Sequence, residues 1–235
     1  AYTDRAGNPG AASNRLALTG DSATPAAPTV DTLADGSEVN ATEAADGTAL
    51  AGTGEQGTVI VALLTGTAID PATGADREVM IEANVGSNGS FTIPVTAGQL
   101  ASLGEGRIRY SLRSRNATGN FSTASEGEFS LDTTLPTITI ASDKSALKAG
   151  ETATITFTLS ESSSNFTLAD VAVSGGTLGS LSGSGASYTA TFTPTANSTT
   201  AGSISVAAAK FTDAAGNDNT ASNSLSIDID TVVPT

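Results

Sequence analysis

Cysteine, histidine and tryptophan are all absent from this chain of 235 residues. Their absence excludes disulfide bonds, thiol nucleophiles, Ser-His-Asp triads, histidine general bases and zinc sites built from Cys and His. Aromatic residues make up only 4% of the chain and hydrophobic residues 38%, so we expect cores of Val, Ile, Leu and Ala. The composition argues against an enzyme, and oxygen atoms remain as the main ligands for any binding chemistry.

Positive charge is also scarce, because 24 Asp and Glu face 10 Lys and Arg and leave a net charge of -14. Such a surface repels phosphate, so neither nucleic acid nor an anionic membrane is an expected partner. The longest apolar run, Val59–Leu64, is far shorter than the ~20 residues of a transmembrane helix. The sequence predicts a soluble, monomeric segment of a larger protein, without membrane insertion. Its acidic oxygens favour hard cations such as Ca²⁺, which takes about 6 to 8 oxygen ligands.

Two short signals recur along the chain in the same order. The first is a turn that ends in Asn, found at Thr3–Asn8, Asn116–Asn120 and Thr212–Asn217. The second is Asp-x-x-x-Pro, found at Asp21–Pro25, Asp132–Pro136 and Asp230–Pro234. Successive copies lie about 100 residues apart, which is the size of an immunoglobulin-like sandwich domain. The repeat predicts the last strand of an upstream module (1–20), two whole modules (21–131 and 132–229) and a linker to a next repeat (230–235).

Period-two alternation predicts that the modules consist of β-strands. Residues 151–160 alternate strictly, with Ala153, Ile155, Phe157 and Leu159 on one face. Further strands are expected at 58–64, 78–85, 90–95, 107–115, 126–131, 137–140, 188–192, 204–206 and 225–229, and only Ala97–Leu103 is expected to be helical. The fold class is therefore all-β, with tandem antiparallel Ig-like β-sandwiches arranged as an elongated rod.

Several segments carry a resemblance to a known family. The second module is similar to the bacterial Ig-like repeats of giant, type I-secreted, RTX-type cell-surface adhesins, and the first module resembles another branch of that group. The segments that carry the likeness are Pro136–Ile140, Ala149–Thr152, Phe192–Pro194, Thr212–Asn217 and Asp230–Pro234, and, in the first module, Ala51–Gly54, Gly89–Pro94, Gly106–Tyr110 and Gly119–Asn120. The resemblance implies an extracellular protein on a Gram-negative bacterial surface. Its repeats would act as spacers that project a distal adhesive region in cell adhesion or biofilm formation.

The repeated acids predict a calcium site where the modules meet. In an Ig-like sandwich, the loop between the last two strands faces the linker that leads into the same module. We therefore expect Asp213 and Asn217 to approach Asp132, and the loop after the second strand to bring Glu161 to the same place. Without a nearby Lys or Arg these oxygens would repel one another unless a cation lay among them. Ca²⁺ is the predicted ion, and its effect would be to stiffen the junction.

The same argument places Asp21 near Asn116 and Asn120, in a poorer site with fewer negative charges. The remaining candidate ligands are Asp4 and Asn8 in the upstream turn, and Asp228 and Asp230 at a junction whose other half lies beyond the chain. The expected partners are neighbouring repeats of the same chain.

Other interpretations remain open. An Asp-Ala-Ala-Gly-Asn segment is also a good turn without any ion, because Asp caps its own backbone and Gly tolerates positive φ. A ligand-binding module for a glycan or a cell surface is an alternative, with the loop Thr65–Arg77 as its expected site. Catalysis by two carboxylates is disfavoured, because the acids lie at repeated junctions and no aromatic platform for a sugar is evident.

Overall fold

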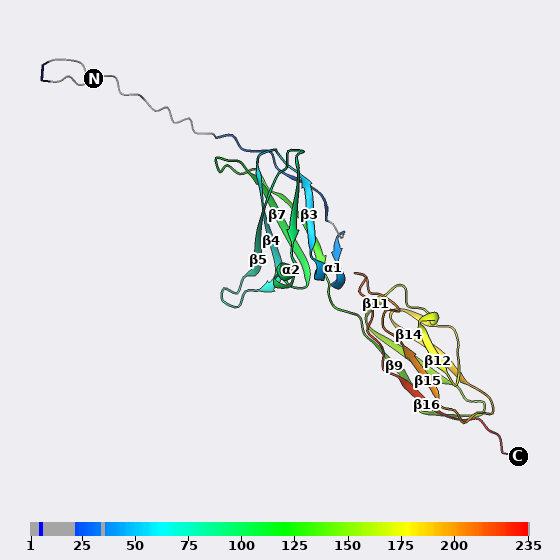
Figure 1. Ribbon diagram of the computed structural model, residues 1–235. Helices are drawn as coiled ribbons and strands as arrows, with labels where there is room; N and C mark the ends of the chain where they lie inside the picture. The colour runs from blue at the N-terminus through cyan, green and yellow to red at the C-terminus, as the bar shows by residue number, and fades with distance from the viewer. Residues whose placement is uncertain (1–4, 7–21, 34–35, 235) are drawn as a thin grey trace.

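The computed structural model describes residues 5–6, 22–33 and 36–234, and it contains two β-sandwiches that follow one another along the chain (Figure 1). We call residues 29–131 the first sandwich and residues 138–230 the second sandwich. Each has two sheets around a hydrophobic core of its own. Among the described residues, no helix has both the length and the apolar character needed to cross a membrane.

The first sandwich packs a three-stranded sheet, in the order β1-β3-β6, on a five-stranded sheet, in the order β2-β8-β7-β4-β5. Its strands are β1 (Thr29–Leu33), β2 (Glu38–Val39), β3 (Thr48–Thr53), β4 (Val59–Ile69), β5 (Asp76–Asn84), β6 (Ser90–Val95), β7 (Gly106–Arg115) and β8 (Ser125–Leu131). Neighbouring strands are antiparallel except β2 and β8, which pair in parallel.

The second sandwich has two four-stranded sheets, in the orders β10-β16-β15-β12 and β13-β14-β11-β9. Its strands are β9 (Ile138–Ser142), β10 (Ala146–Lys148), β11 (Ala153–Ser163), β12 (Val171–Ser174), β13 (Gly176–Leu178), β14 (Ser182–Pro194), β15 (Gly202–Val206) and β16 (Leu225–Asp230), with a 3-10 turn η1 (Leu168–Asp170) before β12. Here β10 and β16 form the parallel pair. An all-β Ig-like sandwich was predicted and is confirmed; the parallel pairs were not foreseen.

Two short helices, α1 (Ala41–Asp46) and α2 (Ala97–Leu103), lie at the end of the first sandwich that faces the second (Figure 1). The sequence predicts α2 with these bounds. The expectation that no other helix exists is wrong, because six residues of α1 are too few to show a helical period. The missed signal is its capping box, in which Asn40 and Glu43 satisfy each other's backbone N–H groups.

The two cores differ in composition. The first consists mainly of aliphatic side chains from both sheets, including Leu50, Ile60 and Leu112, as the composition predicts. The second is built around the ring of Phe166, whose centroid lies 5.7 Å from Phe157, 5.2 Å from Tyr188 and 5.2 Å from Phe211. Four aromatic rings thus pack together in the second core. Phe157 was expected there from the alternation of 151–160, whereas the cluster around Phe166 was not predicted.

The alternation predicted for 151–160 is observed in β11, with its four apolar side chains buried. The long loop expected at Thr65–Arg77 is mostly strand, because β4 continues to Ile69 and β5 begins at Asp76. Only residues 70–75 form the tip of this hairpin, where Asp70 accepts the N–H of Ala72 at 2.7 Å. The proposed ligand loop is therefore the end of a β-hairpin, with a register shift between Thr65 and Ile69.

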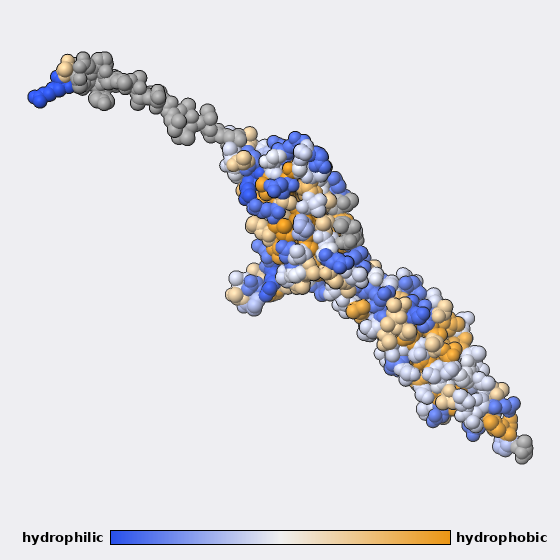
Figure 2. All heavy atoms as spheres, in the orientation of Figure 1, coloured by the Kyte–Doolittle hydropathy of each residue, from blue (hydrophilic) through white to orange (hydrophobic). Residues whose placement is uncertain are grey.

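On the face shown in Figure 2, hydrophilic atoms cover much of the region where the sandwiches meet, and hydrophobic atoms appear in separate areas of each flank. Large exposed apolar side chains are dispersed over the chain, with Val232 at 52% and Val233 at 64% near its C-terminal end. Scattered exposure of this kind is ordinary for a protein surface.

Candidate metal centre at the joint between the sandwiches

The turn at 213–217 is closed by its own two end residues. The N–H of Asp213 donates to the carbonyl of Asn217 at 3.2 Å, and the N–H of Asn217 donates to Asp213 Oδ1 at 2.9 Å. Gly216 has a φ of +90°, which L side chains rarely adopt. Both end residues are buried, with 7% of Asp213 and 3% of Asn217 exposed. The turn therefore holds a carboxylate in a nearly closed environment.

Side chains at the end of β11 fix this turn to the rest of the second sandwich. The N–H of Thr212 donates to Asn165 Oδ1 at 3.0 Å, and Ser163 Oγ donates to the carbonyl of Thr212 at 2.7 Å. The Phe166–Phe211 ring contact supports the same position from the core. Because Glu161 lies two residues before Ser163, this arrangement brings the Glu161 and Asp213 carboxylates together.

The third carboxylate comes from the linker between the sandwiches. The N–H of Asp132 donates to the carbonyl of Val39 at 3.0 Å, which continues the β2–β8 pairing into the linker. The Asp132 carbonyl in turn accepts a hydrogen bond from Asn217 Nδ2 at 2.9 Å, and its Oδ1 accepts the N–H of Thr134 at 3.0 Å. Asp132 is thus held by both sandwiches.

One carboxylate oxygen from each of Asp132, Glu161 and Asp213 lies within 4.8 Å of the others. Burial raises the pKa of Glu161 above its ordinary value of 4.5, and the negative charges of Asp213 and Asp132 raise it further. No Lys or Arg forms an ion pair with any of the three within the described part of the chain. The cluster therefore carries like charges that the protein itself does not neutralise.

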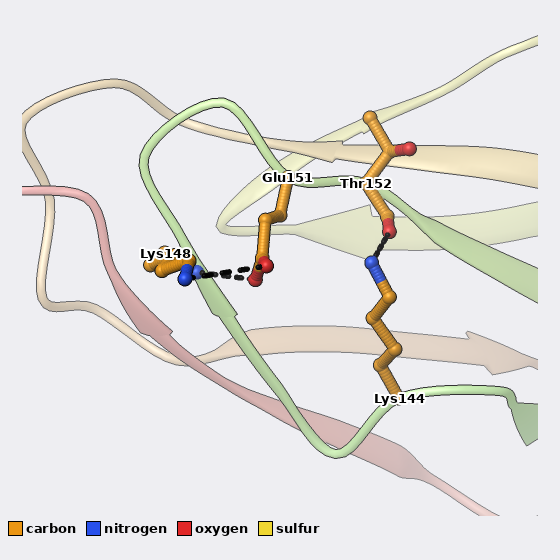
Figure 3. A network of polar contacts seen from close by, with 4 residues as sticks. All are labelled: Lys144, Lys148, Glu151 and Thr152. Carbon is orange, nitrogen blue, oxygen red and sulfur yellow. Dashed lines mark hydrogen bonds and ion pairs between the residues drawn. The ribbon is translucent and has the colours of Figure 1, made fainter.

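The lysines of the second sandwich make other contacts. Lys148 Nζ pairs with Glu151 at 3.8 Å and Lys144 Nζ donates to the carbonyl of Thr152 at 2.8 Å, as Figure 3 shows. Both lie in the β9–β11 connections, away from the 213–217 turn. Lys210 is exposed and forms no ion pair with a described residue.

Asn217 forms hydrogen bonds to three parts of the protein. Its Oδ1 accepts the N–H of Ala41 at 2.7 Å, and its Nδ2 donates to Asp213 Oδ2 and to the Asp132 carbonyl, both at 2.9 Å. The amide predicted to be a metal ligand thus also connects the turn, the linker and the first sandwich.

The corresponding turn of the first sandwich also binds its leading linker, but through amides. Asn116 Nδ2 donates to the carbonyl of Ala23 at 3.0 Å and Asn120 Nδ2 donates to the same oxygen at 3.1 Å. Both side chains therefore present N–H groups to the linker, where a cation would need oxygen. Asp21, the predicted third member of this site, lies outside the described residues.

The remaining predicted ligands are not brought into a cluster. Asp4 and Asn8 also lie outside the described residues. Asp228 and Asp230 are exposed on β16 at the opposite end of the second sandwich, where Asp230 Oδ1 accepts the N–H of Val232 at 3.3 Å.

Sequence reasoning missed the residues that position the site: Ala41, Ser163, Asn165 and Thr212. Ser163 and Asn165 lie in the segment 161–165 that was expected to approach the turn, so their short polar side chains were the available signal. Ala41 could have been found only through the capping box of α1. The loop expected to carry Glu161 is in fact the last part of β11.

A family model matches the second sandwich. Residues 132–229 match the model of the bacterial Ig-like domain. No curated protein matches the chain.

The chain is also similar to several solved structures, at low sequence identity. A 1.5-MDa bacterial ice-binding adhesin, described for host cell surface retention, is 16% identical with a TM-score of 0.42, over 88% of this chain and 66% of that one. The Escherichia coli adhesin FdeC is 16% identical with a TM-score of 0.47, over 86% and 65%. Fibronectin(III)-like modules of Clostridium thermocellum CbhA are 14% identical with a TM-score of 0.33, over 87% and 95%. The chain thus spans about two thirds of the two adhesin chains.

Proposed function

We propose that this chain is a pair of spacer repeats from a bacterial cell-surface adhesin, and that Ca²⁺ bound at the joint between the sandwiches makes the pair rigid. The observation that carries the proposal is the cluster of Asp132, Glu161 and Asp213, whose carboxylate oxygens lie within 4.8 Å of one another and form no ion pair with any described Lys or Arg. The bacterial Ig-like family of residues 132–229 supports an architectural role in place of catalysis.

The donor set fits calcium on chemical grounds. Ca²⁺ is a hard cation that binds carboxylates, carbonyls and water, whereas softer metals prefer the Cys and His ligands that this chain lacks. The three carboxylates come from the linker, β11 and the 213–217 turn. A cation among them would remove their mutual repulsion and would tie the linker to two separate segments of the second sandwich.

The linker already has limited freedom, which makes a single added contact effective. On the side of the first sandwich, Glu105 Oε2 accepts the N–H of Thr133 at 2.9 Å. On the other side, the carbonyl of Pro136 accepts the N–H of Thr220 at 2.9 Å, and Thr137 pairs with Ser160. Pro136 is buried and its φ is fixed by the ring, so the linker is restricted at both of its ends.

This chemistry suits a protein exported by a type I route to the surface of a Gram-negative cell. Extracellular calcium modules typically bind with Kd values of ~10⁻⁴ to 10⁻³ M, so the joint would be filled outside the cell and empty in a low-calcium cytoplasm. Repeats that stiffen after export would project a distal adhesive region in cell adhesion or biofilm formation.

Isothermal titration of the chain with Ca²⁺ tests the site. We expect saturable binding to the wild type and its loss in Asp132→Ala. Asp143→Ala is the matched control, because Asp143 also caps a backbone N–H, that of Thr154 at 2.7 Å, but lies outside the cluster. Equal binding by the wild type and Asp132→Ala would exclude this site.

Small-angle scattering tests the mechanical part of the proposal. We expect the radius of gyration to fall when a chelator removes Ca²⁺, because a minority of the molecules then leaves the docked arrangement. An unchanged radius of gyration in saturating Ca²⁺ and in chelator would contradict calcium-dependent rigidity.

A further inference from the structure

The N-terminus of α1 has one backbone donor that the first sandwich does not satisfy. The first N–H groups of a helix have no partner within it and must be satisfied from outside. In α1 the N–H groups of Thr42 and Glu43 both donate to Asn40 Oδ1 at 3.0 Å, and that of Ala44 donates to the Asn40 carbonyl at 2.8 Å. The N–H of Ala41 alone is satisfied by the second sandwich, through Asn217 Oδ1 at 2.7 Å.

The second helix at the same end provides a contrast. α2 has an equivalent capping box of Thr96 and Gln99. The N–H of Ala97, its first residue, donates to no atom among the described residues. Ala41 and Ala97 are both half-buried, so they differ mainly in whether the other sandwich reaches them.

The Asn217 amide fits its surroundings in one orientation only. Its oxygen faces the Ala41 donor, and its nitrogen faces two acceptors, Asp213 Oδ2 and the Asp132 carbonyl. A flipped amide would oppose donor to donor and acceptor to acceptor. Gly216 lies against the first sandwich, because a Cβ there would be in ordinary van der Waals contact with Asn40 Nδ2, at 3.5 Å.

We propose that Asn217 is an inter-sandwich clasp, which sets the orientation of the two sandwiches by hydrogen bonds to Ala41 and Asp132 and does so without a metal ion. Its side chain bonds to both sandwiches and to the linker, and only 3% of Asn217 is exposed to solvent. A buried amide that loses a partner pays a desolvation penalty, so the docked arrangement is favoured over a pivoted one. The proposed calcium site would strengthen a joint whose geometry the clasp already defines.

Ala41→Pro tests the clasp with little change elsewhere. Proline is well tolerated at the first position of a helix, and it removes only the N–H that Asn217 binds. Asn40 has a ψ of -178°, an extended conformation that suits a residue before proline. Ala97→Pro is the matched control, because Thr96 is also extended, with a ψ of 157°.

Electron-electron double resonance between nitroxides at Thr92→Cys and Thr158→Cys reports the orientation. Both positions are exposed, and the chain has no other Cys. In chelator we expect one narrow distance peak for the otherwise wild-type chain and for Ala97→Pro, and loss of that peak for Ala41→Pro. An equally narrow peak for Ala41→Pro, or an equally broad distribution for all three, would overturn the clasp.

Amide hydrogen exchange of the wild type gives a second test that needs no variant. In chelator we expect the N–H of Ala41 to exchange at least roughly tenfold more slowly than that of Ala97. Equal rates would overturn the clasp. The clasp and the calcium proposal fail separately: a narrow peak in chelator that Ca²⁺ leaves unchanged removes the calcium effect alone, whereas a peak that is narrow only in Ca²⁺ removes the clasp alone.

Discussion

The two turns that meet the linkers, Asn116–Asn120 and Asp213–Asn217, have the same hydrogen-bond frame. In each, the side-chain Oδ1 of the first residue accepts the N–H of the last, at 2.8 Å and 2.9 Å. In each, the first N–H donates back to the last carbonyl, at 3.1 Å and 3.2 Å. The final Asn then donates to a linker carbonyl, that of Ala23 or of Asp132.

The turns differ in their first residue, which is Asn116 in one and Asp213 in the other. Beyond Oδ1, these two side chains carry different polar atoms. In Asn116 it is Nδ2, which donates to the linker carbonyl of Ala23. In Asp213 it is an oxygen, which accepts from Asn217 and belongs to a side chain of the three-carboxylate cluster. One backbone frame therefore presents an amide to the linker in the first turn and carries a carboxylate of the acidic cluster in the second.

The repeated turn has two separate properties: it docks on its linker, and in one copy it adds a carboxylate that could bind Ca²⁺. In both cases the hydrogen-bond frame joins the turn to its linker through protein atoms. Sensitivity to Ca²⁺ should depend on the carboxylates added to that frame.

Asp213→Asn should have the largest effect, because it gives the second turn the side chain of the first. We expect the Ca²⁺ affinity to fall by roughly tenfold or more, which corresponds to about 1.4 kcal/mol. Calorimetric titration measures this change. Asp170→Asn is the control, since Asp170 caps the N–H of Thr167 at 2.7 Å and is not part of the cluster. An unchanged affinity for Asp213→Asn would show that the carboxylate does not distinguish the two turns.

Asn120→Ala should lower the free energy of unfolding by a smaller amount, because it weakens the contact between the Asn116–Asn120 turn and its linker. It removes the donor to Ala23, and a hydrogen bond between neutral groups contributes about 0.5 to 1.5 kcal/mol. We expect the same loss of unfolding free energy in urea with Ca²⁺ and with chelator. A loss that appears only in Ca²⁺ would mean that the first turn also depends on the ion.

Glu161→Gln should give the smallest change in stability, and the size of that change should depend on pH. The raised pKa of Glu161 means that folding disfavours its charged form, through burial and through Asp213 and Asp132. Its contribution to stability is therefore fully present below the ordinary value of 4.5 and is lost as the pH rises through the higher pKa of the folded state.

In chelator, the wild type should therefore lose stability relative to Glu161→Gln as the pH is raised from about 4 to about 7. Thermal unfolding of the two proteins across this range measures the difference. A difference that does not change with pH would contradict the assigned cause.

Much of this fold could be predicted, because its strands are short and alternate strictly. β11 and β16 could be recognised from period two, and α2 from its bounded Ala97–Leu103 pattern. α1 and β3 were missed, since Thr48–Thr53 is mostly Ala, Gly and Thr and shows little contrast between its faces. Their positions depend on tertiary packing more than on local preference.

The candidate site was partly predictable for a related reason. Its three carboxylates lie in segments whose place in an Ig-like sandwich is fixed by topology. The role of Asn217 was not predictable, because its amide could serve a metal or a hydrogen bond equally well by sequence alone. The choice depends on Ala41, which is 176 positions away in the chain.

Crystals of the chain grown in Ca²⁺, with anomalous scattering recorded at long wavelength, would show directly whether the three carboxylates bind the ion. We expect a calcium peak about 2.3 to 2.6 Å from carboxylate oxygens of Asp132, Glu161 and Asp213, and none at the turn that contains Asn116. A map without a peak at the three carboxylates, at a Ca²⁺ concentration of several millimolar, would contradict the proposed site.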